Sequence, residues 1–294
     1  GTTFTHITNS PIIQQYIPML GEAVDTVGGP QIRSMGTIGG NICNGATSAD
    51  SASTMAALEA LIVLEGPEGE RIVPIKDFYT GPGKTVRQHA EVCKYFIIRR
   101  ESIEGWHGRY MKYGKRRAME IATLGCAVRV KLSADKKIIE DVRLAYGVAA
   151  PTPMRCYEAE AVLRGKMVDD EGALDEFIRT ALTEVNPRSS WRASKEFRLQ
   201  LIAELARRAL ADAVQLAGGK ADIATGSAKG AATDIIVEAA ADHADTAASY
   251  ADAAADCAES QSGHADTTAG CAETDGSDFS EIGEGEGKGG GFDA

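Results

Sequence analysis

The stretch TIGGNICNGATSAD, from Thr37 to Asp50, is the most informative part of the chain. It holds two adjacent glycines, Gly39 and Gly40, between short polar side chains. Glycine has no Cβ, so its backbone can take a positive φ and approach a ligand closely. Consecutive backbone amides in such a turn can point inward and bind an anion. A cofactor that carries phosphate and sugar hydroxyls fits this set of groups.

The glycine pair alone is a weak signal for cofactor binding. A turn of this kind between two elements is structural more often than it binds phosphate. The spacing matches neither the P-loop pattern nor the dinucleotide pattern G-x-G-x-x-G. The residues by themselves therefore leave both interpretations open.

Helices and strands are predicted on both sides of this stretch. Apolar spacing predicts a helix over 11–27, stopped by the Gly-Gly-Pro at 28–30, and a second helix over 51–60. The segment LIVLEGPEGERIVPI, at 61–75, has two β-rich runs around a turn and predicts a hairpin. Two more elements are expected before residue 100: a turn at 81–84 and a strand over 91–98.

The pattern restarts after about residue 105. Two strands and two helices are predicted: strands over 125–132 and 138–148, and helices over 157–163 and 174–185. A long amphipathic helix then runs to about Leu216, with Ser190 or Ser194 as its N-cap. Gly218 and Gly219 end it, as glycines commonly end helices. This order of elements predicts an α+β protein.

The C-terminal part of the chain differs in composition from the rest. Residues 221–294 hold 16 acidic and 2 basic residues and very few large apolar groups. Such a segment cannot bury enough surface to offset its ordering entropy, so a disordered acidic Ala/Asp/Gly-rich tail is predicted. The remaining residues are nearly neutral, and nothing resembles the charge pattern of a nucleic-acid-binding protein. Three segments are predicted: domains at 1–104 and 105–219, and a tail at 220–294.

The sequence contains no membrane or metal signal. No apolar run approaches the ~20 residues that a membrane-spanning helix needs, and the first ten residues do not resemble a signal peptide. Six cysteines lie at positions 43, 93, 126, 156, 257 and 271, with no C-x-x-C pair and hence no usual zinc or iron–sulfur spacing. Scattered thiols are typical of a reducing compartment. We expect a soluble cytoplasmic protein that binds no metal ion through its own side chains.

Five segments together resemble one family. They are GGPQIRSMGTIGGNICNGATSADSAS (28–53), FYTGPGKT (78–85), MEIATLGCA (119–127), GVAAPTPMR (147–155) and RSSWRASKEFRLQLI (188–202). In order and spacing they resemble the FAD-binding subunits of the molybdenum hydroxylases, above all those of bacterial xanthine dehydrogenases. The resemblance covers roughly residues 1–219. It implies the second subdomain of a PCMH-type FAD-binding domain, followed by a CO-dehydrogenase-flavoprotein-type C-terminal α+β domain.

The resemblance also implies a cofactor, partners and a role. FAD would receive electrons from iron–sulfur centres and pass them to NAD or another acceptor, while the protein positions it and excludes water. The partners would be a molybdopterin-binding subunit, which oxidises the substrate, and a 2Fe-2S subunit. No side chain of this chain is expected to act as an acid–base catalyst.

Nine cofactor contacts follow from the matched positions: Val27, Thr37, Ile38, Gly39, Gly40, Asn41, Asp50, Cys93 and Lys112. The residues from Thr37 to Asn41 would lie along the phosphate and ribityl part of FAD, and Asp50 would accept a hydrogen bond from the cofactor. Each position has a structural alternative. Asp50 can be a helix N-cap, Val27 and Cys93 can be core side chains, and Lys112 can belong to a basic surface.

One feature of the family is not found. Its flavin subunits begin with a subdomain that carries a Leu-x-Ala-Gly-Gly-Thr type loop for the FAD pyrophosphate, whereas this chain opens at a stretch resembling the start of the second subdomain. This leaves a second hypothesis: a truncated, non-catalytic docking subunit that does not bind FAD. A related FAD-dependent UDP-sugar reductase is a third, disfavoured by the segments at 147–155 and 188–202.

Overall fold

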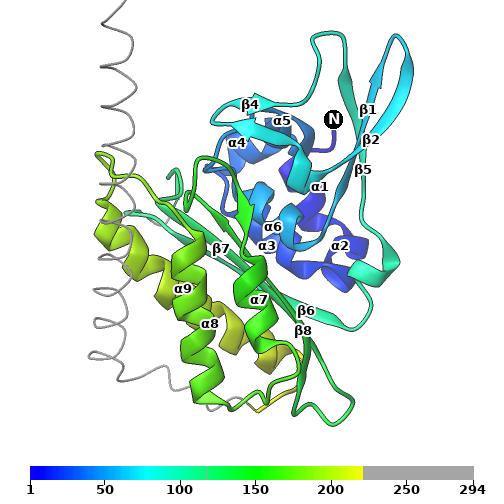
Figure 1. Ribbon diagram of the computed structural model, residues 1–294. Coiled ribbons are helices and arrows are strands. Elements are labelled where there is room, and N and C mark those ends of the chain that lie inside the picture. The colour runs from blue at the N-terminus through cyan, green and yellow to red at the C-terminus, as the bar shows by residue number, and fades with distance from the viewer. Residues whose placement is uncertain (117, 221–294) are drawn as a thin grey trace, which may run out of the picture. The chain divides into compact units, whose positions relative to one another are not determined.

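Short helices and a small antiparallel sheet make up the N-terminal half of the chain (Figure 1). The computed structural model describes residues 1–116 and 118–220. The helices are α1 (Phe4–Asn9), α2 (Pro11–Tyr16), α3 (Pro18–Asp25), α4 (Pro30–Met35), α5 (Ile38–Cys43) and α6 (Asp50–Ala57). The strands are β1 (Leu61–Gly66), β2 (Gly69–Pro74), β3 (Tyr79–Gly81), β4 (Lys84–Thr85) and β5 (Val92–Ile97). Strand β1 lies between β2 and β5, and β3 pairs with β4.

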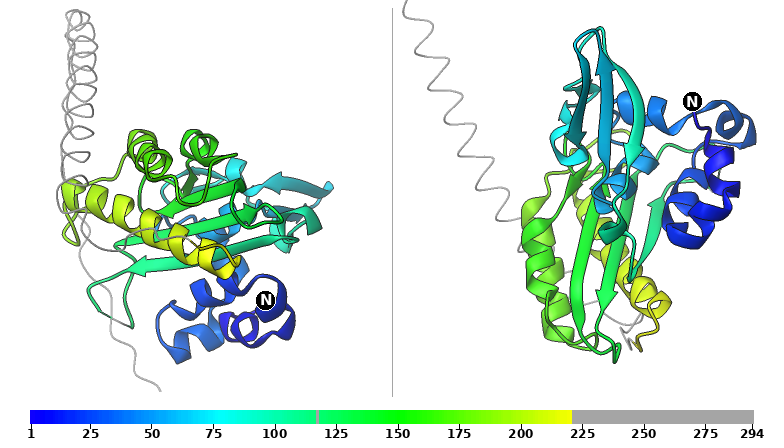
Figure 2. Two further views of the ribbon diagram at one scale, coloured as in Figure 1. Left: turned by 90° about the horizontal axis from the view of Figure 1, so that it is seen from below. Right: turned by 90° about the vertical axis from the view of Figure 1, so that its right-hand side faces the viewer.

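The second half of the described residues, which we call the C-terminal half, is a four-stranded antiparallel sheet with three helices. Its strands, in the order in which they pair, are β6 (Trp106–Tyr113), β7 (Leu124–Leu132), β8 (Ile139–Gly147) and β9 (Met154–Arg155). Its helices are α7 (Tyr157–Leu163), α8 (Glu171–Glu184) and α9 (Lys195–Leu216). Helix α9 runs along the sheet against β6 and β7 (Figure 2). Two 3₁₀ turns complete the described elements, at Ile75–Asp77 and Arg100–Ser102.

Most of the predicted elements are confirmed. The hairpin at 61–75 is the β1–β2 pair, in which Leu61 faces Pro74 and Gly66 faces Gly69. The turn at 81–84 connects β3 to β4. Of the two candidate caps for the long helix, Ser194 is the one used, because its hydroxyl accepts a hydrogen bond from the Phe197 amide. The α+β class is therefore correct.

The single helix predicted over 11–27 is wrong, because two helices occupy that range. Helix α2 ends at Tyr16 and α3 begins with Pro18 at its first position. The ring of a proline pushes the preceding residue out of the α region, and Ile17 has φ −144° and ψ 54°. The prediction failed because the spacing of apolar residues continues from α2 into α3, although Pro18 breaks the helix between them.

Both faces of the C-terminal sheet are buried. On β7, Leu124, Cys126 and Val128 pack into the core formed with α7, α8 and α9. The side chain of Ala127 points the other way, into the core built on the N-terminal helices, together with Tyr110 and Ala145. Successive residues of a strand point to opposite faces, so one sheet serves both cores. This arrangement brings residues of β6 next to residues of α3 and α6.

Strand β6 was not predicted from the sequence. It contains Gly108, which lowers its strand propensity. A Cβ at this glycine would lie 2.7 Å from Cγ of Arg129 and 2.9 Å from Sδ of Met19. Glycine is therefore required here by tertiary packing, at the place where β6 passes between β7 and α3.

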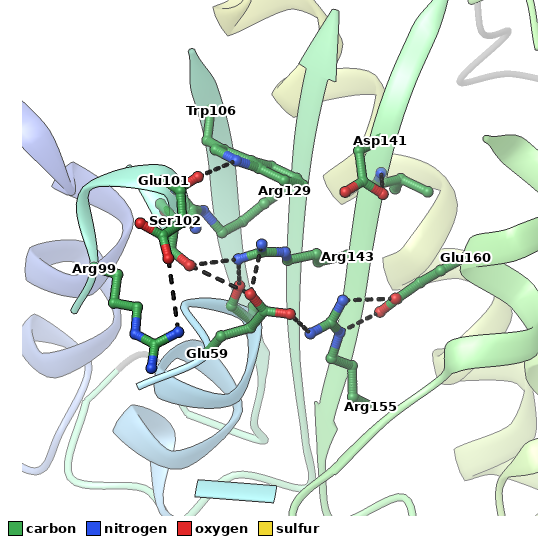
Figure 3. Close-up of polar contacts among 12 residues, drawn as sticks. Glu59, Arg99, Glu101, Ser102, Trp106, Arg129, Asp141, Arg143, Arg155 and Glu160 are labelled. Atoms are coloured by element: carbon green, nitrogen blue, oxygen red, sulfur yellow. Dashed lines mark hydrogen bonds and ion pairs between the residues drawn. The ribbon is translucent and has the colours of Figure 1, made fainter. Parts of the chain in front are cut away.

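A polar cluster joins the turn after α6 to the C-terminal sheet (Figure 3). Glu59 pairs with Arg143 at 2.7 Å and with Arg155 at 2.6 Å, and Arg155 also forms a two-pronged pair with Glu160. The guanidinium of Arg143 stacks on Trp106, 4.2 Å from the ring centroid. Because these residues come from the turn after α6 and from β6, β8, β9 and α7, the cluster ties the two halves together.

The predicted disordered tail, beyond residue 220, lies outside the described residues. So does Arg117, which follows Lys112 by five positions in the sequence. The boundary predicted at residue 104 stays a prediction, since the described residues of both halves share the C-terminal sheet.

Candidate functional site

A cavity of about 560 Å³ lies between helix α5 and strand β5, and we name it the α5–β5 cavity. Five of the nine residues expected to contact FAD line it: Thr37, Ile38, Gly39, Gly40 and Cys93. Apolar side chains form much of the remaining wall: Ile7, Ile13, Leu20, Met55, Phe96 and Ile98. Its size and mainly apolar wall with few polar groups are typical of cofactor sites.

The backbone at the glycine pair differs from the expected turn. Gly39 and Gly40 lie in the first turn of α5, and neither has a positive φ. Thr37 is the N-cap, and its hydroxyl accepts a hydrogen bond from the Gly40 amide at 3.1 Å. The anion nest predicted from the two glycines is therefore replaced by the start of a helix, in which the first amides have no intrahelical acceptor.

Gly39 is the residue of this turn whose backbone amide is free to bind a ligand. Its amide has no acceptor among the described residues, whereas the amides of Ile38 and Gly40 bond to Thr2 and Thr37. A Cβ built on Gly39 meets no atom within 4 Å. The protein's own packing therefore does not require glycine at position 39. Gly39 lines the cavity, so a side chain added there would extend from its wall.

Arg87 gives the cavity a positive charge. It lines the cavity and donates to the backbone carbonyl of Glu91 at 2.9 Å. The carboxylate of Glu91 is taken by Arg71, at 2.5 and 2.8 Å, and Arg87 has no ion pair among the described residues. A free amide, an unpaired guanidinium and an apolar wall together fit a cofactor with an anionic and an apolar part.

The other predicted residues lie outside this cavity. Asp50 and Lys112 form a buried ion pair, with 2.9 Å between Oδ2 and Nζ. Tyr110 donates to Oδ1 of the same carboxylate at 2.6 Å, and Lys112 also donates to the carbonyl of Thr26 at 3.0 Å. Burial raises the pKa of Asp50, against the lowering effect of Lys112 and Tyr110. Cofactor contact by Asp50 and Lys112 stays a prediction.

Asp50 is not a helix N-cap. It is the first residue of α6, Ala49 holds the cap position, and no side chain caps this helix. The structural alternative suggested by the sequence is therefore wrong. The carboxylate is directed instead to the side chains of β6, where it receives the two hydrogen bonds described above.

Asn41 and Val27 lie outside the cavity wall, and each forms a hydrogen bond with a neighbouring segment. The side-chain oxygen of Asn41 accepts a hydrogen bond from Ser51 at 2.6 Å, which ties α5 to α6. Val27 is partly buried against the N-terminal core, and its carbonyl accepts from Arg33 at 3.2 Å. A direct contact of either residue with the cofactor stays a prediction.

Cys43 and Arg87 on the cavity wall were not among the nine cofactor contacts predicted from the sequence. Cys43 and Arg87 line the cavity beside the predicted residues. A helical reading of the stretch would have indicated Cys43, because residues three and four apart share a helix face and Cys43 follows Gly39 and Gly40 at those spacings. Arg87 follows β4 in a loop and has no comparable sequence signal.

Cys43 and Cys93 line the same wall, on the contacting elements α5 and β5, and their side chains influence each other's ionisation. The hydrogen bond from Cys93 lowers the pKa of Cys43 to about 7, burial opposes this and the charge of Arg87 assists it. The same hydrogen bond, together with burial, raises the pKa of Cys93. The directions of the two shifts favour the thiolate on Cys43.

Within residues 1–116 and 118–220, no group of three or more His, Cys, Asp or Glu side chains is placed to hold a metal ion. None of the helices described in those ranges is long and apolar enough to cross a membrane.

Both halves match known family models. Residues 1–98 match the FAD binding domain in molybdopterin dehydrogenase, and residues 109–213 match the CO dehydrogenase flavoprotein C-terminal domain.

Individual relatives match across both halves. The chain is 44% identical over 220 residues to the xanthine dehydrogenase FAD-binding subunit of Escherichia coli O157:H7, covering 75% of this chain and 74% of that one. It is 32% identical to the carbon monoxide dehydrogenase medium chain of Hydrogenophaga pseudoflava, with 71% of each covered. Reconstituted CO dehydrogenase from Oligotropha carboxidovorans superposes with a TM-score of 0.68 at 30% identity, covering 73% of each chain. With these matches, the chain belongs to the FAD-binding subunits of the molybdenum hydroxylase family.

Proposed function

We propose that this chain is the electron-transfer subunit of a xanthine dehydrogenase-like molybdenum hydroxylase. Its partners would be a molybdopterin-binding subunit and a 2Fe-2S subunit, and its electron acceptor NAD⁺ or another oxidant. The observation that carries the proposal is the α5–β5 cavity, whose largely apolar wall includes Gly39, with its open amide, and Arg87, which has no ion pair among the described residues. Bound FAD supplies the redox chemistry, because a flavin can hold one or two electrons.

The residues of the chain have three tasks in this proposal. The Gly39 amide and Arg87 offset negative charge on the phosphate part of the cofactor, since charge-assisted hydrogen bonds are the strong ones. The apolar wall excludes water from the rest of the cofactor. Asn41 holds α5 against α6 through its hydrogen bond with Ser51, which keeps the Gly39 amide in place.

The Asp50–Lys112 pair stabilises the packing of helix α6, which is tied to α5 through Ser51 and Asn41. Each side chain is anchored twice, Asp50 by Lys112 and Tyr110, and Lys112 by Asp50 and the Thr26 carbonyl. The pair therefore fixes α6 against β6 and the end of α3. In this proposal it also presents a carboxylate to the cofactor, as the family resemblance implies for Asp50.

The partner and substrate assignments rest on the relatives. Those that match include a FAD-binding subunit of a xanthine dehydrogenase, medium chains of carbon monoxide dehydrogenases and a FAD-subunit of a nicotinate dehydrogenase. In the proposed assembly the substrate is oxidised in another chain. This chain contributes a cofactor position and no acid–base side chain.

The test is the visible spectrum of the purified full chain after desalting, with and without added FAD. About one flavin per chain, seen by its absorption bands, supports the proposal. Gly39→Val fills the open space on the wall and should weaken FAD binding by at least tenfold, about 1.4 kcal/mol, with little change in melting temperature. Gly172→Val is the matched control, because Gly172 holds the same second position in helix α8, far from the cavity.

A different result selects the second hypothesis. A chain that stays colourless when FAD is added does not bind flavin on its own, and it would then act as a docking subunit. If Gly39→Val and Gly172→Val bind FAD equally well, the first turn of α5 is not part of the FAD site. The family assignment would not be affected by that result.

A further inference from the structure

The paired thiols on the cavity wall come from segments far apart in sequence. Cys43 is the last residue of helix α5, and Cys93 is the second residue of strand β5. Both are partly exposed, and both line the α5–β5 cavity. The other described cysteines, Cys126 and Cys156, are fully buried in the C-terminal core. Only the first pair therefore combines mutual contact with access for a small reagent among residues 1–116 and 118–220.

The two thiols are not equivalent. Cys43 receives the hydrogen bond of Cys93, which favours its thiolate, whereas the Arg87 guanidinium lowers the pKa of both thiols. Cys93 keeps its proton, because it donates it to Cys43 and is desolvated. A thiolate is the nucleophile of thiol chemistry, and a neighbouring thiol can resolve the oxidised product.

We propose that Cys43 and Cys93 form a reversible redox pair, in which the Cys43 thiolate attacks a hydroperoxide and Cys93 is the resolving thiol. The Cys43 thiolate attacks one peroxide oxygen, the O–O bond breaks, and the leaving oxygen takes a proton to become an alcohol or water. This leaves a sulfenic acid on Cys43. The sulfur of Cys93 then attacks the sulfur of Cys43, and water leaves. In sum, the two thiols lose two electrons and two protons, and the hydroperoxide gains them.

The disulfide would change the cavity. A sulfur–sulfur bond of ~2 Å requires the contacting thiols to move closer. The last turn of α5 and the β5 strand would then be linked covalently across the wall that carries Gly39 and Gly40. Oxidation is therefore expected to weaken cofactor binding. This consequence rests on the proposed function, whereas disulfide formation does not.

The test treats the full chain with hydrogen peroxide, blocks the remaining thiols and maps the peptides by mass spectrometry. A peptide pair joined through Cys43 and Cys93, two hydrogens lighter than the reduced peptides and separated by dithiothreitol, is the expected result. The experiment is repeated in a Cys257→Ser/Cys271→Ser background, because those two thiols lie outside the described residues. If Cys43 and Cys93 stay reduced, or either pairs mainly with another cysteine, the proposal is overturned.

Single variants assign the two roles. In Cys93→Ser, dimedone should trap a sulfenic acid on Cys43, because no resolving thiol remains. In Cys43→Ser, Cys93 should stay unmodified under the same conditions. Equal trapping at both positions would overturn the assignment of roles. A disulfide that forms but leaves FAD content unchanged would overturn only the effect on the cofactor, and a chain that never binds FAD still reports the disulfide.

Discussion

Replacing Lys112 with Met should destabilise the protein far more than the loss of a surface charge. The side chains of Lys112 and Asp50 are 10% and 7% exposed, and their charged atoms lie 2.9 Å apart. Removing one partner of a buried pair leaves the other charge without compensation in a poorly solvated place. The expected loss in the free energy of unfolding is about 3–5 kcal/mol. An exposed pair would lose at most ~1 kcal/mol.

The assay is urea unfolding of the full chain, followed by circular dichroism and by tryptophan fluorescence. Asp50→Asn/Lys112→Met is the control, because it removes both charges and should be more stable than Lys112→Met alone. A loss below ~1 kcal/mol in Lys112→Met would refute the reasoning, since the pair would then behave as a solvated one. So would a double variant that is less stable than the single one.

The same variant should show a characteristic pH dependence. Burial already raises the pKa of Asp50, and Lys112 opposes this effect. Without Lys112, the pKa of Asp50 in the folded state should rise further above its value in the unfolded chain. A group with a raised folded pKa stabilises the protein at low pH and loses that contribution as pH rises through the folded pKa. The deficit of Lys112→Met relative to the parent should therefore be smaller at about pH 5 than at about pH 8.

Three further outcomes follow from other contacts. Glu160→Gln removes the charge that holds both prongs of Arg155, and it should lower stability by about 3 kcal/mol in urea unfolding; an unchanged midpoint would contradict this. Ser194→Ala removes the N-cap of α9 and should cost about 1 kcal/mol in the same assay, whereas no loss would mean that the cap is replaced. The alkylation rate of Cys43 should rise with pH and reach half its maximum at about pH 7, because the hydrogen bond from Cys93 lowers its pKa to about 7. In Cys93→Ala the curve should move to higher pH, as measured by mass spectrometry of the Cys43 peptide, and an unmoved curve would disprove the coupling.

Local features were predictable from the sequence wherever neighbouring residues decide the structure. The hairpin at 61–75 is confirmed, since its turn and its two β-rich runs are contiguous. The Ser194 cap follows from one side chain and an amide three residues later. Family membership was likewise predictable, because it rests on short motifs that keep their order and spacing.

The conformation of the glycine pair was less predictable. Gly39 and Gly40 were read as a turn with positive φ, but they begin a helix that Thr37 caps. Glycine permits both conformations, so its presence does not decide between them. The decision depends on packing, since Ile38 and Ile42 of the same helix are buried in the N-terminal core.

The sequence by itself determined the α+β class, most of the elements, the flavoprotein family and the stretch that contributes helix α5 to the candidate site. Only the tertiary structure decided which of those residues share a cavity, and that Asp50 pairs with Lys112 across 62 positions of the chain. It also placed Cys43 against Cys93 and put β6 between β7 and α3. The physical reason is that periodicity and caps report contacts within a few residues. Burial, ion pairing and cavity shape depend instead on which distant segments the packed core brings together.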